Sequence, residues 1–351
     1  MNWSNNPLSR RNFIRLASGV VVSFTAFGLT GCSAITNKKN TSATSPNNNI
    51  NSAIDTGTEH AKVFFTNNIS TKGLIDIYSH INEGITGKVA IKLHTGEPHG
   101  PNLLPIDLIK SLQGTIPNSA IVECNVLYNS PRQHTETHRE VLKTNGFTFC
   151  PVDIMDDEKD IMLPVPNIKE RIEKKLVANP SAHIIEVPVG SHILNYDSML
   201  VYTHFKGHTM GGFGGSLKNI GIGAASRNGK AIVHGEGWPI GKAFLTRMVE
   251  SGFAIADHFK NHITYINVLK NMSVDCDCDA HGAPPTCNDI GILASTDILA
   301  IDQASIDLVY KLPENQRHDL VERIESREGL YQLDYMEELG LGNRKYDLIQ
   351  I

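Results

Sequence analysis

From about residue 61 onward, short apolar runs alternate with longer stretches whose apolar residues recur at helical spacing. Short runs flanked by glycine, proline or polar residues predict strands, and the longer periodic stretches predict helices. The predicted strands are Lys88–Leu93, Ala120–Val126, Thr148–Val152, His183–Val189, Ser198–Phe205, Ile263–Leu269 and Asp289–Ala294. The predicted helices are Ile75–Asn82, Ile106–Leu112, His138–Asn145, Gly241–Lys260, Asp297–Lys311 after a cap-like Ser295, and Leu320–Leu339. This alternation favours an α/β fold, with a largely parallel or mixed sheet and helices on both faces.

The stretch that follows the predicted strand Ser198–Phe205 is rich in glycine. Seven glycines fall between Thr203 and Arg227, and because glycine costs backbone entropy, this indicates positive φ angles or close backbone approaches. Open α/β sheets bind ligands where their strands end, so we expect a crevice here; the alternative is a solvated connection. The expected catalytic residues are Lys206, His204 and His208, and the expected ligand-binding residues are Lys218, Asn219, Gly214, Gly215, Arg227 and Glu97. Lysines among exposed backbone N–H groups suit a small anionic ligand.

A second polar stretch, Asp275–His281, is the strongest candidate for a metal site. It places Cys276 and Cys278 one residue apart, with His94 as a further candidate ligand at the end of an earlier strand. Thiolates and imidazoles suit a transition metal such as zinc or iron. The spacing matches no standard zinc finger and no ferredoxin run, so one disulfide with free thiols, or an acidic calcium-type loop, remains open as an alternative.

Several common site types are not supported by the sequence. The glycine-rich stretch is neither a nucleotide P-loop nor a dinucleotide-binding fingerprint, and there is no Gly-x-Ser-x-Gly nucleophile elbow. The net charge is −5, and residues 1–31 contribute three arginines and no acidic residue, so the rest of the chain is more acidic still. This acidic balance argues against nucleic acid as a partner.

The first 60 residues differ in composition from the rest. Residues 1–32 have the three parts of a bacterial export signal: the twin arginines Arg10 and Arg11, an apolar run, and a lipobox-like ending at Cys32. The alternative is an ordinary N-terminal anchor helix. Residues 33–60 are rich in Asn, Ser and Thr and predict a flexible polar tether. We therefore expect the twin-arginine export machinery and, through a lipid on Cys32, the membrane of the bacterial cell envelope as partners. Residues 61–351 then form a single α/β domain, or two closely packed lobes.

Several of these motifs resemble the family called domain of unknown function 362. The resemblance is carried by His204–His208 with Gly212–Gly221, Val89–Glu97, Asp275–Cys278 with Asp289–Ser295, Ala300–Ser305 and Gly340–Gly342. Many members carry a ferredoxin-like insert after the glycine-rich stretch, which implies redox work. This chain has no cysteine between Arg227 and Asp275, so we expect no ferredoxin-type cluster module. Families with a twin-arginine signal typically fold before export, often around a cofactor.

Two hypotheses follow. The first is an exported, lipid-anchored protein with a metal-dependent, redox-type active site in the glycine-rich crevice. Its metal would be held by Cys276 and Cys278 with a histidine, and Lys206 and Lys218 would hold an anionic substrate group. The second is a non-catalytic, surface-tethered binding protein for a small anionic ligand. A scaffold lipoprotein, whose glycines serve packing alone, is a third reading.

Overall fold

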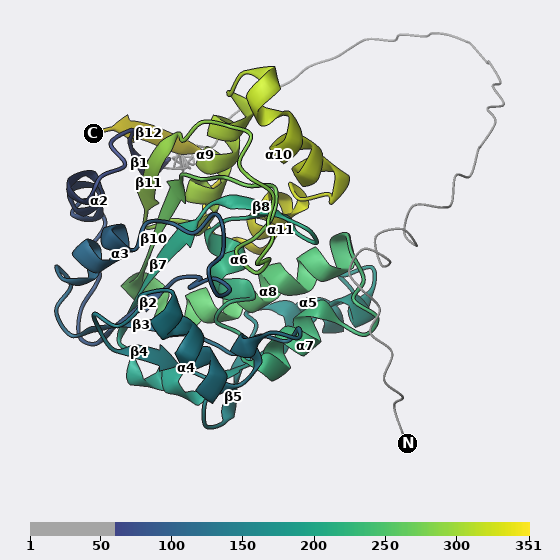
Figure 1. Ribbon diagram of the computed structural model, residues 1–351. Helices are drawn as coiled ribbons and strands as arrows, with labels where there is room; N and C mark the ends of the chain where they lie inside the picture. Colours follow the sequence, from purple (N-terminus) through teal and green to yellow (C-terminus); the bar gives the residue numbers. More distant parts are fainter. Residues whose placement is uncertain (1–59) are drawn as a thin grey trace, which may run out of the picture. The chain divides into compact units, whose positions relative to one another are not determined.

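The apolar runs form the strands of one eight-stranded mixed sheet with helices on both faces, which confirms the predicted fold class (Figure 1). The computed structural model describes residues 60–351, which belong to one compact unit. Arg10, Arg11, Cys32 and the tether up to residue 59 lie outside the described residues. In spatial order the strands are β12 (Tyr346–Gln350), β1 (Ala61–Thr66), β11 (Gly291–Ser295), β10 (Ile263–Leu269), β7 (Ser198–His204), β2 (Val89–Lys92), β3 (Ser119–Glu123) and β4 (Val152–Ile154).

The strand directions determine which loops meet. β11 is antiparallel to both of its neighbours, β10 and β1, whereas every other pair in this sheet is parallel. The carboxyl ends of β2, β3, β7 and β10 therefore share one edge with the amino end of β11. We call this the carboxyl edge. β1 and β12 pair in parallel from Ala61 opposite Tyr346 to Phe65 opposite Gln350. Because β1 is antiparallel to β11, both strands also end at the carboxyl edge.

Alternate residues of the central strands enter two hydrophobic layers. On β7, Leu200 and Tyr202 face one layer, while Met199 and Val201 face the other. The first layer is covered by α2 (Thr71–Tyr78) and α3 (Ile106–Gln113), which lie on one side of the sheet in Figure 1. The helices that cover the second layer are α6 (Ser216–Gly221), α8 (Lys242–Phe259) and α9 (Ile298–Tyr310). With both faces covered, the loops at the edge are left to carry function.

The remaining elements surround this core. The helices are α4 (Thr135–Thr144), α5 (Ile168–Glu173), α7 (Arg227–His234), α10 (Glu314–Ser326) and α11 (Tyr331–Leu339). Two small antiparallel sheets pair β5 (Asp160–Pro164) with β6 (Glu186–Gly190), and β8 (Lys206–His208) with β9 (Gly212–Gly214), and only the second pair is a hairpin. The second pair lies within the glycine-rich stretch and supports the site described below.

The predicted helix Leu320–Leu339 is wrong in one respect, because it is two helices, α10 and α11. The chain turns at Glu328, which has a φ of 53°. A Cβ on the following Gly329 would lie 3.0 Å from the Gly211 carbonyl oxygen, so close packing on the β8–β9 turn dictates the break. The predicted end of the second helix at Gly340 is confirmed, with a φ of 72°.

Four smaller predictions also differ from the structure. The helix predicted at Ile75–Asn82 begins earlier, because the Ser70 hydroxyl accepts a hydrogen bond from the Gly73 N–H. The strand predicted at Thr148–Val152 forms as β4, mostly after Val152, and only the second half of His183–Val189 becomes a strand, β6. The N-cap of α9 is Asp297 rather than Ser295, since Asp297 accepts from the Ala300 N–H.

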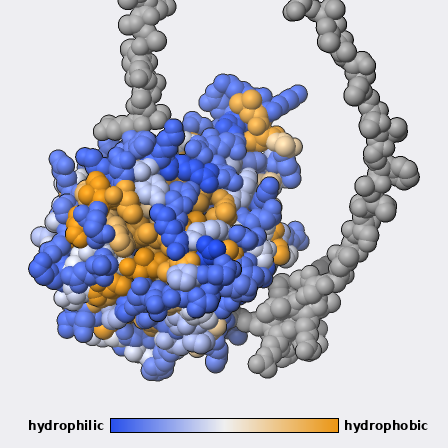
Figure 2. Space-filling model, turned by 90° about the horizontal axis from the view of Figure 1, so that it is seen from above, coloured by the Kyte–Doolittle hydropathy of each residue, from blue (hydrophilic) through white to orange (hydrophobic). Residues whose placement is uncertain are grey.

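The outer surface is mixed in character. Figure 2 shows a continuous band of hydrophobic residues on the face seen from above, framed by hydrophilic ones. Among residues 60–351, none of the helices has both the length and the apolar character that crossing a bilayer requires.

Candidate functional site

A long loop, residues 270–290, carries both candidate cysteines along the carboxyl edge. It leaves β10 and returns as β11, so its two ends lie on hydrogen-bonded neighbouring strands. The β8–β9 hairpin packs directly against it: the Gly207 N–H donates to the Ser273 carbonyl at 2.7 Å. A Cβ on Gly207 would lie 2.3 Å from the Val274 carbonyl oxygen. Glycine at this position therefore permits the hairpin and the cysteine loop to touch.

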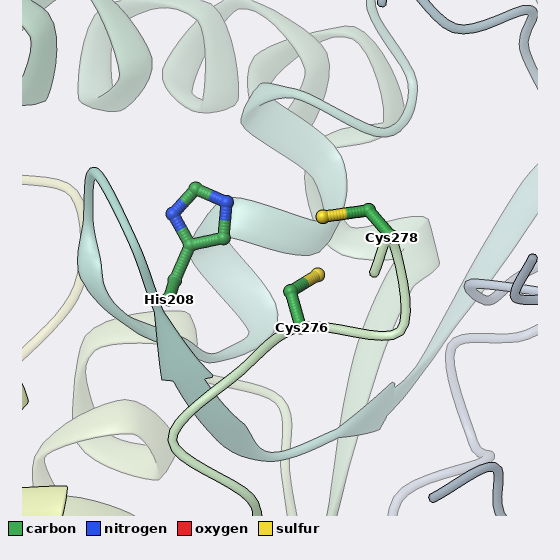
Figure 3. A group of neighbouring side chains, drawn as sticks. All are labelled: His208, Cys276 and Cys278. Carbon is green, nitrogen blue, oxygen red and sulfur yellow. The ribbon is translucent and has the colours of Figure 1, made fainter. Parts of the chain in front are cut away.

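This contact brings the two sulfurs together with a histidine. The candidate ligand atoms of His208, Cys276 and Cys278 all lie within 4.8 Å of one another. In Figure 3 the Nε2 edge of the His208 ring faces both sulfurs, and Nδ1 lies on the far side of the ring. His208 and Cys276 are buried, and Cys278 is half-buried. The structure thus assembles a compact centre from β8 and the cysteine loop.

Backbone contacts determine which nitrogen of His208 carries the proton. Nδ1 accepts hydrogen bonds from the N–H groups of Gly211 at 2.9 Å and Met210 at 3.3 Å. Burial and the Lys218 ammonium hold the pKa of His208 well below its usual value, so the ring is neutral. A neutral ring whose Nδ1 accepts must carry its proton on Nε2. His208 therefore offers an N–H donor to the sulfurs.

His94, in the segment that follows β2, is arranged in the same way. The Gly96 N–H donates to His94 Nδ1 at 3.0 Å, and the ring hydrogen bonds to Cys276. Burial and Arg132 lower the pKa of His94, although Cys276 opposes this shift. The ring is therefore neutral, and the proton left on Nε2 is available to the sulfur.

The two cysteines are not equivalent. A hydrogen bond from Cys278 lowers the pKa of Cys276 well below its usual value. Burial opposes this shift, whereas Lys218, Lys206 and His94 add to it. The Lys218 Nζ lies 3.9 Å from the Cys276 sulfur. The same hydrogen bond, together with burial, raises the pKa of Cys278. The pair thus consists of a thiolate at Cys276 and a thiol at Cys278, as expected beside ammonium and N–H donors.

The residue between the cysteines, Asp277, holds the loop in place. Its carboxylate lies 2.9 Å from Lys206 Nζ and 3.0 Å from His204 Nδ1, with all three side chains buried. Burial alone would raise the pKa of Asp277, but His204 and Lys206 lower it. His204 Nε2 also donates to the Lys270 carbonyl at 2.8 Å. His204 and Lys206, predicted as catalytic, thus bind the carboxylate of the residue that separates the two cysteines.

Other predicted site residues lie at or near the same edge. Glu97 accepts hydrogen bonds from Tyr128 at 2.5 Å and Ser130 at 2.6 Å, and its own N–H donates to the Asp277 carbonyl at 3.0 Å. Lys218 and Asn219 lie on α6, where the Asn219 amide donates to the Tyr202 carbonyl at 3.1 Å.

The remaining predicted ligand-binding residues have structural contacts. Gly214 ends β9 and Gly215 precedes α6, where a Cβ would lie 2.4 Å from the Asp302 carboxylate. Arg227 begins α7, and its N–H donates to Asp156 at 2.9 Å. The structure therefore brings together Lys218, His208, His94 and the two cysteines, and places Arg227 beside Asp156.

The sequence analysis missed a buried ion network beneath this site. Glu123 accepts from Lys92 Nζ, from Arg132 Nη2 and from the Thr95 N–H, each at 2.9 Å. Arg132 also lies 3.6 Å from Glu97. The network ties the loop after β2 to the loop after β3. Charged residues within predicted buried strands, Lys92 and Glu123, were the signal that could have revealed it.

His138 contacts this network and predicts a pH dependence of stability. Arg132 Nε donates to His138 Nε2 at 3.2 Å, and burial followed by Arg132 lowers the pKa of His138 to about 3. An unfolded histidine has a pKa near 6.5. Because the folded pKa is the lower one, burying neutral His138 contributes its full stability above pH 6.5. This stability is lost as the pH falls toward 3. Between pH 7 and pH 5 we expect a loss of about 2 kcal/mol from this group.

The matched variant is His138→Gln, because a glutamine amide can accept from Arg132 and donate to Asn125 without titrating. Urea unfolding at pH 7 and pH 5 measures the difference. Between pH 7 and pH 5, we expect the free energy of unfolding to fall by about 2 kcal/mol less in the variant than in the wild type. Equal losses in both proteins would contradict a neutral, buried His138.

Comparison with known proteins places this geometry in a family. The description "Domain of unknown function (DUF362)" applies to a family that matches residues 89–307, which include the central strands, the glycine-rich stretch and the cysteine loop. The chain belongs to the DUF362 family. No curated protein matches it.

Two solved structures are distantly similar to this DUF362 member. One is the lactate racemase apoprotein from Thermoanaerobacterium thermosaccharolyticum, at 10% identity and a TM-score of 0.38, covering 69% of this chain and 56% of that one. The other is a Thermotoga maritima protein, at 12% identity and a TM-score of 0.35, covering 74% of this chain and 59% of that one. This chain therefore spans little more than half the length of either protein.

Proposed function

We propose that this DUF362 member is an exported, envelope-anchored protein whose centre, Cys276 and Cys278, binds one thiophilic transition-metal ion, zinc or iron. The supporting observation is the convergence of two sulfurs and the His208 ring within 4.8 Å. Thiolate sulfur is a favoured ligand for such metals. Two protein thiolates leave further coordination positions open, which is typical of catalytic rather than structural sites. The export signal and the lipid on Cys32 are part of the proposal and rest on the sequence alone.

In this proposal the histidines act as hydrogen-bond donors beside the sulfurs. A histidine that binds a metal usually donates its other ring N–H to an acceptor. His208 instead accepts from Gly211 at Nδ1, and His94 accepts from Gly96. Binding a metal at Nε2 would require a proton on Nδ1, directly against a backbone N–H. The donor set thus fits a dithiolate metal site, with His94 and His208 stabilising the sulfur charge.

Elemental analysis of the chain from residue 33, folded in the cytoplasm, tests the proposal. We expect about one equivalent of metal in the wild type, consistent with a single two-sulfur site, and loss of the metal in Cys276→Ser and in Cys278→Ser. Cys150→Ser and Cys287→Ser are matched controls outside the pair and should retain it. His208→Gln should also retain it, since His208 is a donor and not a ligand. Metal that persists in the Cys276→Ser/Cys278→Ser protein, or none in the wild type, would refute the metal site.

One observation favours a second candidate, a reactive thiolate that works without metal. Lys218, His94 and His208 all direct N–H groups at the sulfurs, and such surroundings stabilise a thiolate. The same samples distinguish the two candidates. Absence of metal together with rapid iodoacetamide labelling of Cys276 supports the metal-free thiolate. Protection of Cys276 that a chelator removes supports the metal site.

A further inference from the structure

A cavity of about 200 Å³ opens beside the cysteine loop, on the side of the sheet that α3 covers. Its apolar walls come largely from the segment that joins β2 to α3, from α3 itself and from the segment before β4. These wall residues are Leu93, Leu103, Leu104, Ile106, Ile109 and Phe147. Leu103 and Leu104 are half-buried and Pro105 is exposed, so the cavity opens to solvent along this segment.

The polar groups that line the cavity already have partners. His204 and Asp277 bind each other, and His204 also binds the Lys270 carbonyl. Thr95 donates its hydroxyl to Glu123, and the Asn145 amide donates to the Thr95 carbonyl at 3.0 Å. No lysine or arginine is among the lining residues that the structure describes. A charged ligand would therefore lose its hydration without gaining a counter-charge.

Tyr202 is the exception among these polar groups. It lines the cavity from β7, its side chain is 2% exposed, and its hydroxyl has no hydrogen-bond partner among residues 60–351. A buried hydroxyl without a partner is costly, and phenylalanine would fill the same position without that cost. Burial raises the pKa of Tyr202, so the group remains a neutral phenol. The hydroxyl thus has an unused donor, and because it is closed to solvent at its present position, a ligand oxygen reaches it only after a small shift of the ring or its neighbours.

We propose that this cavity is a binding site for a compact, uncharged, largely apolar molecule with one carbonyl or hydroxyl oxygen that hydrogen bonds to Tyr202. An apolar cavity of about 150 Å³ is large enough for benzene. A cavity of this size therefore suits a single ring with a short oxygen-bearing substituent. His94 lines the cavity and hydrogen bonds to Cys276. Such a ligand would therefore lie next to the pair Cys276 and Cys278, which we call the dithiol centre.

Three small probes test the inference by calorimetry or ligand-observed NMR. Acetophenone carries the ring and a carbonyl oxygen, ethylbenzene has the same shape without the oxygen, and benzoate adds a charge. We expect acetophenone and ethylbenzene to bind and benzoate not to bind. Tyr202→Phe should weaken acetophenone binding about 3- to 10-fold, as expected for one hydrogen bond, and leave ethylbenzene binding unchanged. Leu104→Trp, which fills the opening, should abolish the binding of both.

The inference is independent of the metal, and the experiment separates the two. Both probes should bind the Cys276→Ser/Cys278→Ser protein as they bind the wild type, whether or not the wild type contains metal. Comparing two probes on each variant also cancels any general loss of folded protein. The inference is overturned if neither probe binds up to its solubility limit, or if Leu104→Trp leaves binding unchanged. It is equally overturned if Tyr202→Phe does not alter the ratio of the two affinities.

Discussion

Glu123→Gln should lower the free energy of unfolding by about 3 to 5 kcal/mol, the cost of breaking a buried ion pair from one side. Glu123 faces Lys92 and Arg132, and all three side chains are at most 2% exposed. With Glu97, the network holds two buried cations and two buried carboxylates. Removing one negative charge leaves an uncompensated positive charge in the interior. Urea unfolding at neutral pH measures the loss.

Two comparisons make this prediction specific. Glu140→Gln removes an exposed carboxylate that pairs only with Lys143 on the same helix, and should change stability by less than about 0.5 kcal/mol. Lys92→Met combined with Glu123→Gln removes one charge of each sign, and should cost less than the sum of the single changes. A Glu123→Gln protein as stable as Glu140→Gln would show that the buried network does not balance these charges.

Asp277→Asn should cost a similar amount, about 3 to 5 kcal/mol, and should also disturb the dithiol centre. The substitution leaves the Lys206 ammonium, whose side chain is 6% exposed, without its carboxylate partner. It also removes the negative charge that faces His204, the residue that anchors the loop to β7. Because Asp277 stands between the two cysteines, we expect lower metal content as well as lower stability.

Asp275→Asn is the matched control in the same loop. Its carboxylate is half-buried, pairs with Arg323 at 3.2 Å and accepts from the Ala283 N–H, so we expect a loss of about 1 kcal/mol and unchanged metal content. Unfolding and elemental analysis are measured on both variants. If Asp277→Asn resembles Asp275→Asn in both readouts, Asp277 does not hold the cysteine loop in place.

The sequence predicts the central elements well, because local pattern and tertiary position agree there. The strand Ile263–Leu269 forms as predicted, since its alternating apolar residues enter both layers of the sheet. The edge strand β12 and its neighbour β1 were missed, because each is only partly buried and gives a weak hydrophobic pattern. The break between α10 and α11 arises where Gly329 meets the β8–β9 turn, a tertiary contact that helical periodicity cannot reveal.

The site was predicted in part for a similar reason. Parallel strands bring their carboxyl ends to one edge, so the glycine-rich stretch and the cysteine loop could be expected to meet, and they do. Which histidine faces the sulfurs depends on side-chain direction and on the Gly211 N–H, and neither can be inferred from spacing. Asp277 could have been recognised from its position between the cysteines, because a carboxylate buried there needs a cationic partner such as Lys206.

The parallel pair β1 and β12 determines how this protein can be attached to a surface or a fusion partner. Ala61 lies at the end of the sheet remote from the cysteine loop, whereas Ile351 lies beyond the other end of β12, with its N–H donating to the Phe65 carbonyl. A label joined ahead of Ala61 therefore meets the described body far from the sulfurs. A label joined after Ile351 is placed at the edge where the dithiol centre lies.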